Sequence, residues 1–388
     1  MSGFTKIETE ARGHPVWAEV DLDALRHNIA TLDRMTGDAE VMGVVKGYAY
    51  GHGNPECARA MLEAGATRLG VARVAEAIHL RERGITAPIN VFTEPPPAAV
   101  QALVGFDLSP TIYTPALAIA LSDAAVAADV VVPVHVKVDT GMHRVGLLAK
   151  DVPDAVRMLR GLPGLAIEGL WTHLAVADVP DHPFTRKQLD LFDEVVGRVE
   201  AAGVHPRFKH VANSAAILTL PEAHRDLVRA GIAAYGLWPS PQLAGSADLR
   251  PVMSLRARIN MTKRVPQGEG LSYGLEYEMP RTARVVTVPV GYADGYARGL
   301  SGRADVLIHG RRYRVSGTVC MDQFMVDVGD AEVEVGDTVT LLGRDGDEAI
   351  TAEELAGHLG TISYEISSRI PSRVVRLFTG GSQSEADA

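Results

Sequence analysis

The chain has 388 residues, of which 46% are hydrophobic and 22% are charged, as is ordinary for a globular protein. This length suggests two domains, or one large barrel and a smaller unit. The 38 basic and 48 acidic residues give a net charge of −10, which argues against a nucleic-acid-binding protein because such a protein needs a basic stripe.

The N-terminal segment and the cysteines indicate a cytoplasmic location. The first 15 residues are polar and lack the apolar core of a secretory signal, and no stretch approaches the length of a membrane span. The only cysteines, Cys57 and Cys320, lie far apart, so no disulfide framework is expected and a reducing compartment fits. No cluster of residues has the spacing of metal ligands, and we expect no metal.

Eight short apolar runs recur every ~20–40 residues in the first two-thirds of the chain, as strands do in a (β/α)8 barrel. They are bounded by Gly, Pro, Asn and Asp. They begin at Val41, Arg68, Ile89, Leu108, Val132, Leu165, Phe208 and Leu227. An additional helix is expected before the first run, over residues 21–35, with Asp21 as a plausible N-cap.

Helical patterns separate several of these runs. Residues 55–65, 72–84 and 183–203 each end at a glycine, which is a common helix terminus. The third pattern predicts one apolar face, made of Leu189, Phe192, Val196 and Val199. Because strands followed by helices imply a parallel sheet, we predict an N-terminal (β/α)8 TIM barrel over residues 1–245.

The pattern changes after Trp238. Residues 239–251 form a linker rich in Pro, Gly and Ser, and short alternating runs with frequent glycines begin at Met253. This alternation predicts a mostly-β C-terminal domain over residues 246–388. One short helix is expected near Ala352 to Gly360, where Glu353 and Glu354 suggest a helix cap. The residues after Phe378 are small and polar, and we expect a disordered tail.

A lysine at the end of the first apolar run is the strongest chemical signal. The segment VMGVVKGYAYGHG places Lys46 after a buried strand and before Gly47, Gly51 and Gly53. A desolvated amine has a lowered pKa and becomes a nucleophile toward carbonyls, as a Schiff-base lysine requires. The alternative is a surface lysine whose amine reaches solvent at a strand end. The small neighbours of Lys46 favour a site, because they let a bulky ligand approach the backbone.

Polar residues also follow the later strands, at the barrel end where active sites form. They are Lys137, Asp139 and Arg144 on strand five, His173 on strand six, Asn213 and Ser214 on strand seven, and Arg229 on strand eight. After Arg229, Gly231 and Ile232 offer backbone N–H groups. Strands seven and eight are where barrels commonly bind phosphate. An amine facing a phosphate site suggests pyridoxal 5'-phosphate, held by an imine to lysine.

Several conspicuous residues favour structural roles. Trp17, Trp171 and Trp238 are expected to pack in the core, and His52 is expected to hydrogen-bond in a loop. Cys320 has no neighbouring group in the sequence that would make it a nucleophile.

Eight sequence strings resemble those of the pyridoxal-phosphate-dependent alanine racemases, which are fold-type III enzymes, over essentially the whole chain. They are VVKGYAYGHG at Lys46, KVDTGMHRVG at Lys137, HVANSAA at Asn213, VRAGIAAYG at Arg229, LSYG at Tyr273, VGYADGYAR at Tyr292, CMDQ at Met321 and YEIS at Tyr364.

The resemblance implies a role for each matching residue. Lys46 forms the imine and serves as one acid/base, and Tyr273 serves as the other on the opposite face. Arg229 donates to the pyridine nitrogen, and His173 links Arg229 toward Tyr273. The implied cofactor-binding residues are Lys46, Tyr50, His173, Asn213, Ser214, Arg229, Gly231, Ile232 and Tyr364. Arg144 and the Met321 backbone N–H hold the substrate carboxylate, Tyr292 and Arg298 line the entrance, and Lys137 is the position that can be carbamylated.

The resemblance also implies a head-to-tail homodimer in which a partner supplies Tyr273 and Met321, and a role in supplying D-alanine for bacterial peptidoglycan. Racemisation needs two proton donors, because a single base returns the proton to the face it came from. Lysine and tyrosine both have ordinary pKa values near ~10, so each must be lowered to act as a base near neutral pH.

Three positions depart from the family's usual pattern and leave the substrate open. They are Gly47-Tyr48, His143 and Thr318. A racemase acting on serine or on a broader range of amino acids is the nearest rival. The sequence also leaves open a decarboxylase of the same architecture and a non-catalytic carrier of the cofactor.

Overall fold

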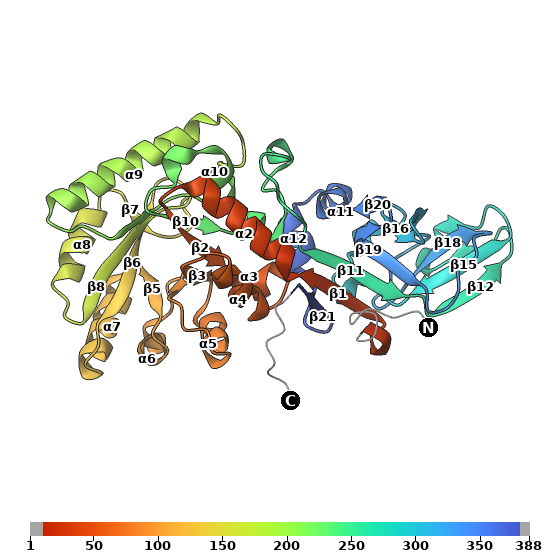
Figure 1. Ribbon diagram of the computed structural model, residues 1–388, viewed down its shortest axis with the longest axis horizontal. Helices are drawn as coiled ribbons and strands as arrows, with labels where there is room; N and C mark the ends of the chain where they lie inside the picture. Colours follow the sequence, from red (N-terminus) through yellow and green to blue (C-terminus); the bar gives the residue numbers. More distant parts are fainter. Residues whose placement is uncertain (1–10, 381–388) are drawn as a thin grey trace. The chain divides into compact units, whose positions relative to one another are not determined.

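The computed structural model describes residues 11–380, which form two compact units (Figure 1). The barrel unit comprises Leu25–Ala49 and Asn54–Arg250. The β unit comprises residues 11–24, Tyr50–Gly53 and residues 251–380. The chain passes between the units for the last time after Arg250, close to the boundary drawn from sequence. The contribution of residues 11–24 to the β unit was not foreseen.

Eight parallel strands form the barrel, in the order β10-β2-β3-β4-β5-β6-β8-β9. They are β2 (Glu40–Val44), β3 (Arg68–Val71), β4 (Ile89–Val91), β5 (Ser109–Ile112), β6 (Val132–Asp139), β8 (Leu165–Trp171), β9 (Phe208–His210) and β10 (Leu227–Ala230). Backbone hydrogen bonds also join β9 to β10, from Asp226 N–H to Lys209 O and from Arg229 N–H to Ala212 O. All eight predicted strands are confirmed, and so is the barrel.

The longer helices of this unit lie outside the strands, as Figure 1 shows for α5 to α9. They are α2 (Leu22–Thr36), α4 (Glu56–Glu63), α5 (Val74–Glu82), α6 (Val100–Gly105), α7 (Pro115–Ala127), α8 (Val152–Arg160), α9 (Pro183–Ala201) and α10 (Ser214–Thr219). The four helices predicted for this part of the chain are confirmed and correspond to α2, α4, α5 and α9. Asp21 caps α2, because its Oδ1 accepts the N–H groups of Asp23 and Ala24. On α9 the fully buried face includes Val195, not the predicted Val196, which is half-buried.

The β unit is built on a seven-stranded sheet in the order β17-β16-β19-β11-β1-β21, with β20 paired to β19. Its strands and those of two smaller sheets are β1 (Val16–Asp21), β11 (Met253–Arg258), β12 (Met261–Val265), β13 (Gly270–Leu271), β14 (Tyr277–Glu278), β15 (Ala283–Val288), β16 (Asp305–Ile308), β17 (Arg311–Arg314), β18 (Phe324–Gly329), β19 (Thr338–Asp345), β20 (Glu348–Ile350) and β21 (Val375–Thr379). The predicted mostly-β C-terminal domain is therefore confirmed.

Three strands of this sheet, β1, β20 and β21, were not predicted. The N-terminal strand β1 pairs antiparallel with β11 and parallel with β21, so the first and last described strands lie side by side. Trp17 on β1 packs with Ala11 and Leu377, which confirms its predicted packing role. The predicted tail begins at Thr379, but Thr379 ends β21, and the tail from residue 381 onward lies outside the described residues.

Two helices complete the β unit, α11 (Ala352–Leu359) and α12 (Ser363–Ser368). The predicted helix at Ala352 is confirmed, and it ends at Gly360 in the left-handed conformation. Its N-cap is Thr351, whose Oγ1 accepts the Glu354 N–H. Across residues 11–380, every helix is too short or too polar to cross a bilayer.

Candidate active site

Lys46 opens a left-handed helical turn, α3 (Lys46–Tyr50), directly after β2. The φ angles of Gly47, Tyr48, Ala49 and Tyr50 are 62°, 56°, 53° and 52°. Left-handed turns are unfavourable for L-residues other than glycine, by about 1–2 kcal/mol per residue, so this turn needs external support. Its backbone is fixed by the Ala49 N–H, which donates to Val45 O at 3.0 Å.

Glu76 supplies further support and was missed by sequence reasoning. Its Oε1 accepts the Gly47 N–H at 2.6 Å, while its Oε2 accepts the N–H groups of Ala72 and Arg73. One carboxylate therefore joins the turn after Lys46 to the start of α5. The sequence carried a signal for half of this role, since a glutamate at the third helical position often caps a helix.

The surroundings of Lys46 favour a neutral amine. Burial lowers the pKa of Lys46, and the positive charges of Arg144 and Arg229 lower it further, while Glu76 acts in the opposite direction. A larger fraction of this amine is therefore unprotonated near neutral pH than for an ordinary lysine. This is the protonation state that attacks a carbonyl carbon.

Lys137 is buried on β6 in a strongly cationic environment. Burial, with help from Arg229 and Arg144, lowers the pKa of Lys137 to about 6, although Asp139 acts to raise it. Its Nζ lies 3.7 Å from the ring centroid of Trp171. Trp171 is buried, as predicted, but its ring contacts charged groups of the site, because it also lies beneath the Arg229 guanidinium.

The loop after β6 is organised by Asp139. Its carboxylate accepts the N–H groups of Gly141 and His143 and contacts His143 Nδ1, each at 3.0 Å. Burial acts to raise the pKa of Asp139, but these hydrogen bonds lower it overall. The loop therefore carries a stable negative charge beside His143, and the exposed Arg144 follows directly.

Arg229 lies on β10 with its guanidinium in a dense set of acceptors. It donates to the backbone oxygens of Thr172, His210 and Val211, at 2.8 to 3.1 Å. It also contacts His210 Nδ1 at 3.0 Å and His173 Nδ1 at 3.3 Å. The pKa of His173 is well below its ordinary value, because burial and the charge of Arg229 both disfavour the imidazolium. His173 is therefore neutral beside Arg229.

Strands β9 and β10 are followed by a cluster of backbone donors. Ser214 Oγ accepts the N–H groups of Gly231 and Ala233, at 3.0 and 3.2 Å, which ties the start of α10 to the turn that begins at Ile232. Asn213 caps α10 through its Oδ1, which accepts the Ala216 N–H. Since Ser214 Oγ accepts both bonds, its own proton can be donated to a ligand.

A second group of predicted residues lies on the β unit. Three exposed side chains belong to it: Tyr273 at 73%, Met321 at 54% and Tyr292 at 44% of full exposure. The segments that carry Tyr292 and Met321 are joined by backbone hydrogen bonds from Tyr292 N–H to Cys320 O and from Ala293 N–H to Met321 O.

Thr318 fixes the segment that carries Tyr273. Its Oγ1 donates to Tyr273 O at 2.8 Å, and its own carbonyl accepts the Ser272 hydroxyl at 2.6 Å. This buried threonine was noted from sequence only as a departure at the entrance. Sequence reasoning therefore missed its structural role.

Tyr50 and Tyr364 form a third group, also on the β unit. Their ring centroids lie 6.2 Å apart, with the rings tilted by 53°. His52 Nδ1 lies 3.1 Å from Tyr50 O, as expected of a residue that hydrogen-bonds in a loop. The predicted site residues thus fall into a barrel-unit set around Lys46 and Arg229 and two β-unit sets around Tyr273 and Tyr364.

The barrel-unit set fits pyridoxal phosphate. The cofactor carries an aldehyde, a pyridine nitrogen and a phosphate. Lys46 offers an amine of lowered pKa, Arg229 a guanidinium that can only donate, and Ser214 a hydroxyl beside backbone N–H groups. Within the stretch that the structure covers, no three His, Cys, Asp or Glu side chains are arranged to hold a metal ion.

Comparison with known proteins identifies the family of both units. Residues 20–239 match the family described as alanine racemase, N-terminal domain, and residues 252–378 match alanine racemase, C-terminal domain. The alanine racemase of Carboxydothermus hydrogenoformans is 43% identical over 366 residues, covering 94% of this chain and 99% of the relative. That of Symbiobacterium thermophilum is 46% identical over 367 residues, covering 94% and 97%.

Solved structures show the same fold. The alanine racemase of a D-cycloserine-producing Streptomyces lavendulae has a TM-score of 0.92 at 41% identity, covering 95% of this chain and 98% of that one. A histidine racemase from Leuconostoc mesenteroides has a TM-score of 0.88 at 30% identity, covering 95% and 99%. Since both domains match in order and the relatives are covered almost from end to end, this chain belongs to the alanine racemase family.

Proposed function

We propose that this protein is a pyridoxal-phosphate-dependent racemase that interconverts L-alanine and D-alanine. One observation carries the proposal: a lysine of lowered pKa follows a barrel strand, in the same unit as a buried arginine whose guanidinium contacts two neutral histidines. Family membership supports the assignment, because the relatives and the first of the two solved structures described above are named alanine racemases.

The cofactor contacts follow from the resemblance to the family. Lys46 would hold the aldehyde carbon, and Arg229 would donate to the ring nitrogen. Ser214, Gly231 and Ile232 would bind the phosphate with Tyr50 and Tyr364. His173 orients Arg229 through its Nδ1, and Asn213 shapes the phosphate-binding turn as the cap of α10. When bound, pyridoxal phosphate supplies an aldehyde that condenses with amines and a ring that draws electron density from Cα.

Two side chains move the proton at Cα. Lys46 exchanges it on one face and Tyr273 on the other, so that removal on one side and delivery on the other inverts the centre. Arg144 and the Met321 N–H hold the substrate carboxylate, and Tyr292 and Arg298 line the entrance. Arg229 is never deprotonated, so it would not transfer a proton to the ring nitrogen of the cofactor. The ring would then draw electron density from Cα only weakly.

Lys137 is proposed to carry a carbamate. Its pKa of about 6 makes the amine neutral at physiological pH. A neutral amine adds to carbon dioxide, forming an N–C bond and releasing one proton. The new carboxylate would neutralise part of the cationic field around Lys137 and orient Arg144.

The working enzyme is proposed to be a head-to-tail homodimer with shared active sites. Tyr273, Met321 and Tyr292 are exposed in the single chain, as residues donated to a partner would be. Activity and molecular mass measured together along a dilution series test this. Loss of activity as the dimer dissociates is expected, and full activity of a monomer would refute it.

A cytoplasmic location is proposed because the sequence has two cysteines, Cys57 and Cys320, which lie far apart in it. D-alanine for peptidoglycan is proposed as the product's use. A broader amino-acid racemase is the second candidate. A histidine racemase shares the fold, and the exposed Tyr48 directly follows Gly47 beside Lys46. The relatives named alanine racemases nevertheless do not favour this alternative.

The proposal is tested by incubating the purified protein with L-alanine in D2O and following chirality and Cα deuterium. Appearance of D-alanine with deuterium at Cα is expected. A panel of L-amino acids, including serine and histidine, separates the two candidates. Release of CO2 would instead indicate a decarboxylase, and cofactor binding without Cα exchange would indicate a carrier.

A further inference from the structure

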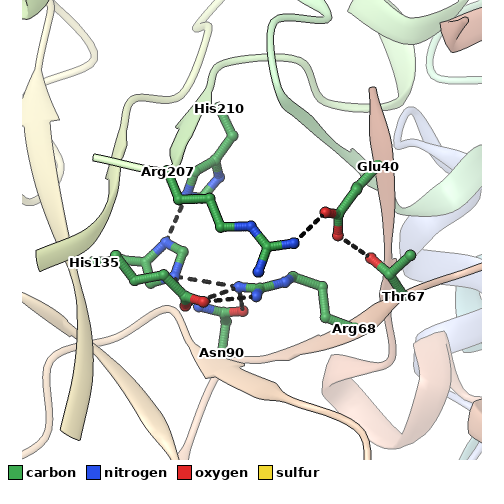
Figure 2. A network of polar contacts seen from close by, with 8 residues as sticks. Glu40, Thr67, Arg68, Asn90, His135, Arg207 and His210 are labelled. Atoms are coloured by element: carbon green, nitrogen blue, oxygen red, sulfur yellow. Dashed lines mark hydrogen bonds and ion pairs between the residues drawn. The ribbon is translucent and has the colours of Figure 1, made fainter. Parts of the chain in front are cut away.

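A line of buried polar residues runs through the barrel core from Arg229. His210 on β9 contacts Arg229 Nη1 through its Nδ1 at 3.0 Å. The Nε2 of His210 lies 2.9 Å from Nδ1 of His135 on β6, as Figure 2 shows for these two rings. His135 Nε2 lies 3.0 Å from Glu168 Oε2 on β8. Glu168 also pairs with Arg68, at 3.0 and 3.1 Å. We call Arg229, His210, His135 and Glu168 the core chain.

The two ends of the core chain fix every proton within it. Arginine can only donate, so His210 Nδ1 must be the acceptor and its proton must sit on Nε2. That proton is donated to His135 Nδ1, which places the proton of His135 on Nε2, facing Glu168. A carboxylate can only accept, so the opposite end requires the same arrangement. Both rings are therefore neutral, with the proton on Nε2.

One close contact between two donors is explained by this arrangement. Arg68 Nη1 lies 3.4 Å from His135 Nε2, although both atoms carry protons. Both atoms donate to the same oxygen, Glu168 Oε2, and this shared acceptor brings them together. The pKa of Glu168 is lowered to about 2, since its hydrogen bonds to His135 and Arg68 outweigh the effect of its burial. The carboxylate is therefore ionised and can accept both protons.

Packing holds the two rings in place. His210 stacks on Trp171 with 8° between the planes, and His135 stacks on Phe208 with 14° between the planes. Gly169 leaves the space for His135, because a Cβ at this position would lie 2.2 Å from His135 Nδ1. Burial and the neighbouring arginines keep the pKa values of both histidines low, so neither ring takes up a second proton.

We propose that His135 and Glu168 are positioning residues for Arg229. Glu168 sets the proton of His135 on Nε2, His135 then accepts the proton of His210, and His210 presents a lone pair that holds the Arg229 guanidinium. The proton arrangement is independent of any reaction. Its consequence for the cofactor's ring nitrogen rests on the proposed function.

The wild-type protein tests the arrangement directly. ¹⁵N NMR of histidine-labelled protein identifies which ring nitrogen carries the proton. Single neutral forms of His135 and His210, each protonated on Nε2, are expected. A proton on Nδ1 of either ring, or on both nitrogens, would overturn the proposal.

Two substitutions of similar size test the role of His135. His135→Asn keeps an amide oxygen near the position of Nδ1, whereas His135→Leu offers His210 no acceptor. In H135N, His210 should keep its wild-type ¹⁵N signals. In H135L, His210 should no longer be protonated on Nε2 alone, and its ¹⁵N signals should change. Pyridoxal phosphate, titrated by absorbance, should bind H135L about tenfold more weakly than wild type, which corresponds to about 1.4 kcal/mol.

Equal spectra and equal cofactor affinity in H135N and H135L would refute the positioning role. If H135L fails to fold, the wild-type and H135N spectra still decide the proton arrangement. If the protein binds the cofactor but racemises nothing, the proposed function fails while the core chain stands. His224→Phe removes another buried histidine of the barrel unit, one that contacts Ile217 O, and should leave the His210 signals unchanged.

Discussion

Tyr273 and Lys46, which we propose as the two acid/base groups at Cα, have different environments. Lys46 sits after a barrel strand with a lowered pKa, whereas the phenol of Tyr273 is exposed on the β unit. A protein with two such groups can exchange the Cα proton on either face. A protein with one of them can exchange it on one face alone.

Tyr273→Phe should therefore remove Cα exchange for one enantiomer of alanine and spare it for the other. Proton exchange of L- and D-alanine in D2O is followed separately by NMR, because each enantiomer reports one face. A loss of about 10²-fold or more in one direction is expected for removal of a general acid/base. Equal loss for both enantiomers would count against two bases.

The acid/base behaviour of Lys137 leads to a pH dependence of stability. Its folded pKa is about 6, below the ordinary 10.5, so between these values the unfolded chain binds a proton that the folded chain does not. The uncarbamylated Lys137 therefore lowers the free energy of unfolding by a growing amount as pH falls from 10.5 to 6, and by a constant amount below pH 6. Carbamylation removes this cost, because the amine no longer titrates.

Labelled ¹³CO2 should give a carbamate ¹³C signal from Lys137 above about pH 6 and lose it below, where the ammonium form prevails. Urea unfolding near pH 8 should show a gain in stability with CO2 that Lys137→Met does not show. A carbamate signal that persists in Lys137→Met would assign the modification to another amine.

At the scale of elements, the turn after β2 is the least ordinary part of the barrel. Its sequence, KGYAY, predicts neither a helix nor a common turn, and the left-handed backbone depends on contacts from Glu76 that lie outside the segment. Sequence reasoning placed Lys46 correctly just after a buried strand, but the conformation that follows is set by tertiary contacts.

Gly47→Ala tests whether this turn serves the site. Gly47 has φ of +62° with no atom within 4 Å of a new Cβ, and Gly84, after α5, has φ of +81° and equally open space. Alanine at either position should cost about 1 kcal/mol of folding stability. In urea unfolding the two variants should be alike, but only Gly47→Ala should reduce kcat. Equal kcat in both variants would show that the conformation of this turn does not affect catalysis.

Two arginine–glutamate pairs of the barrel unit differ in the burial of the arginine, and we expect them to differ in their contribution to stability. Glu168 pairs with Arg68, whose side chain is only 4% exposed, while Glu40 pairs with Arg207, which is 65% exposed. Glu168→Gln leaves a buried arginine without its charge partner and should cost about 3 kcal/mol. Glu40→Gln should cost less than about 1 kcal/mol.

The free energies of unfolding in urea at neutral pH decide this comparison, and equal costs would contradict it. The difference also has a pH dependence. The folded pKa of Glu168 is about 2, below the ordinary 4.5, so the stability it provides is present above pH 4.5 and lost as pH falls toward 2. The difference in free energy of unfolding between wild type and Glu168→Gln should therefore disappear as pH falls from 4.5 toward 2.

At the scale of the whole molecule, the order of elements could be predicted because each carries its own pattern. Eight apolar runs and four helical patterns were found where the structure has them, since buried strands and amphipathic helices have local signals. The strands β1 and β21 were missed because their pairing joins opposite ends of the chain. A six-residue run that leads directly into a helix gives no sign of partners so distant.

The site was predictable to the extent that its residues occur in recognisable strings. Lys46, Arg229 and Tyr273 fall within such strings, and the structure assigns them to two separate units. Glu76, His135, Glu168 and Thr318 were not predicted as functional. Their roles depend on single hydrogen bonds between elements, which no local pattern records.

The central claim is that the Lys46 amine forms an imine with pyridoxal phosphate. Borohydride reduction of the protein loaded with the cofactor, followed by peptide mapping, tests it most directly. We predict loss of absorbance near ~420 nm, as expected of an imine-bound cofactor, and one labelled peptide in which Lys46 carries the cofactor. A label on Lys137 or on any other side chain, or no label, would contradict the account.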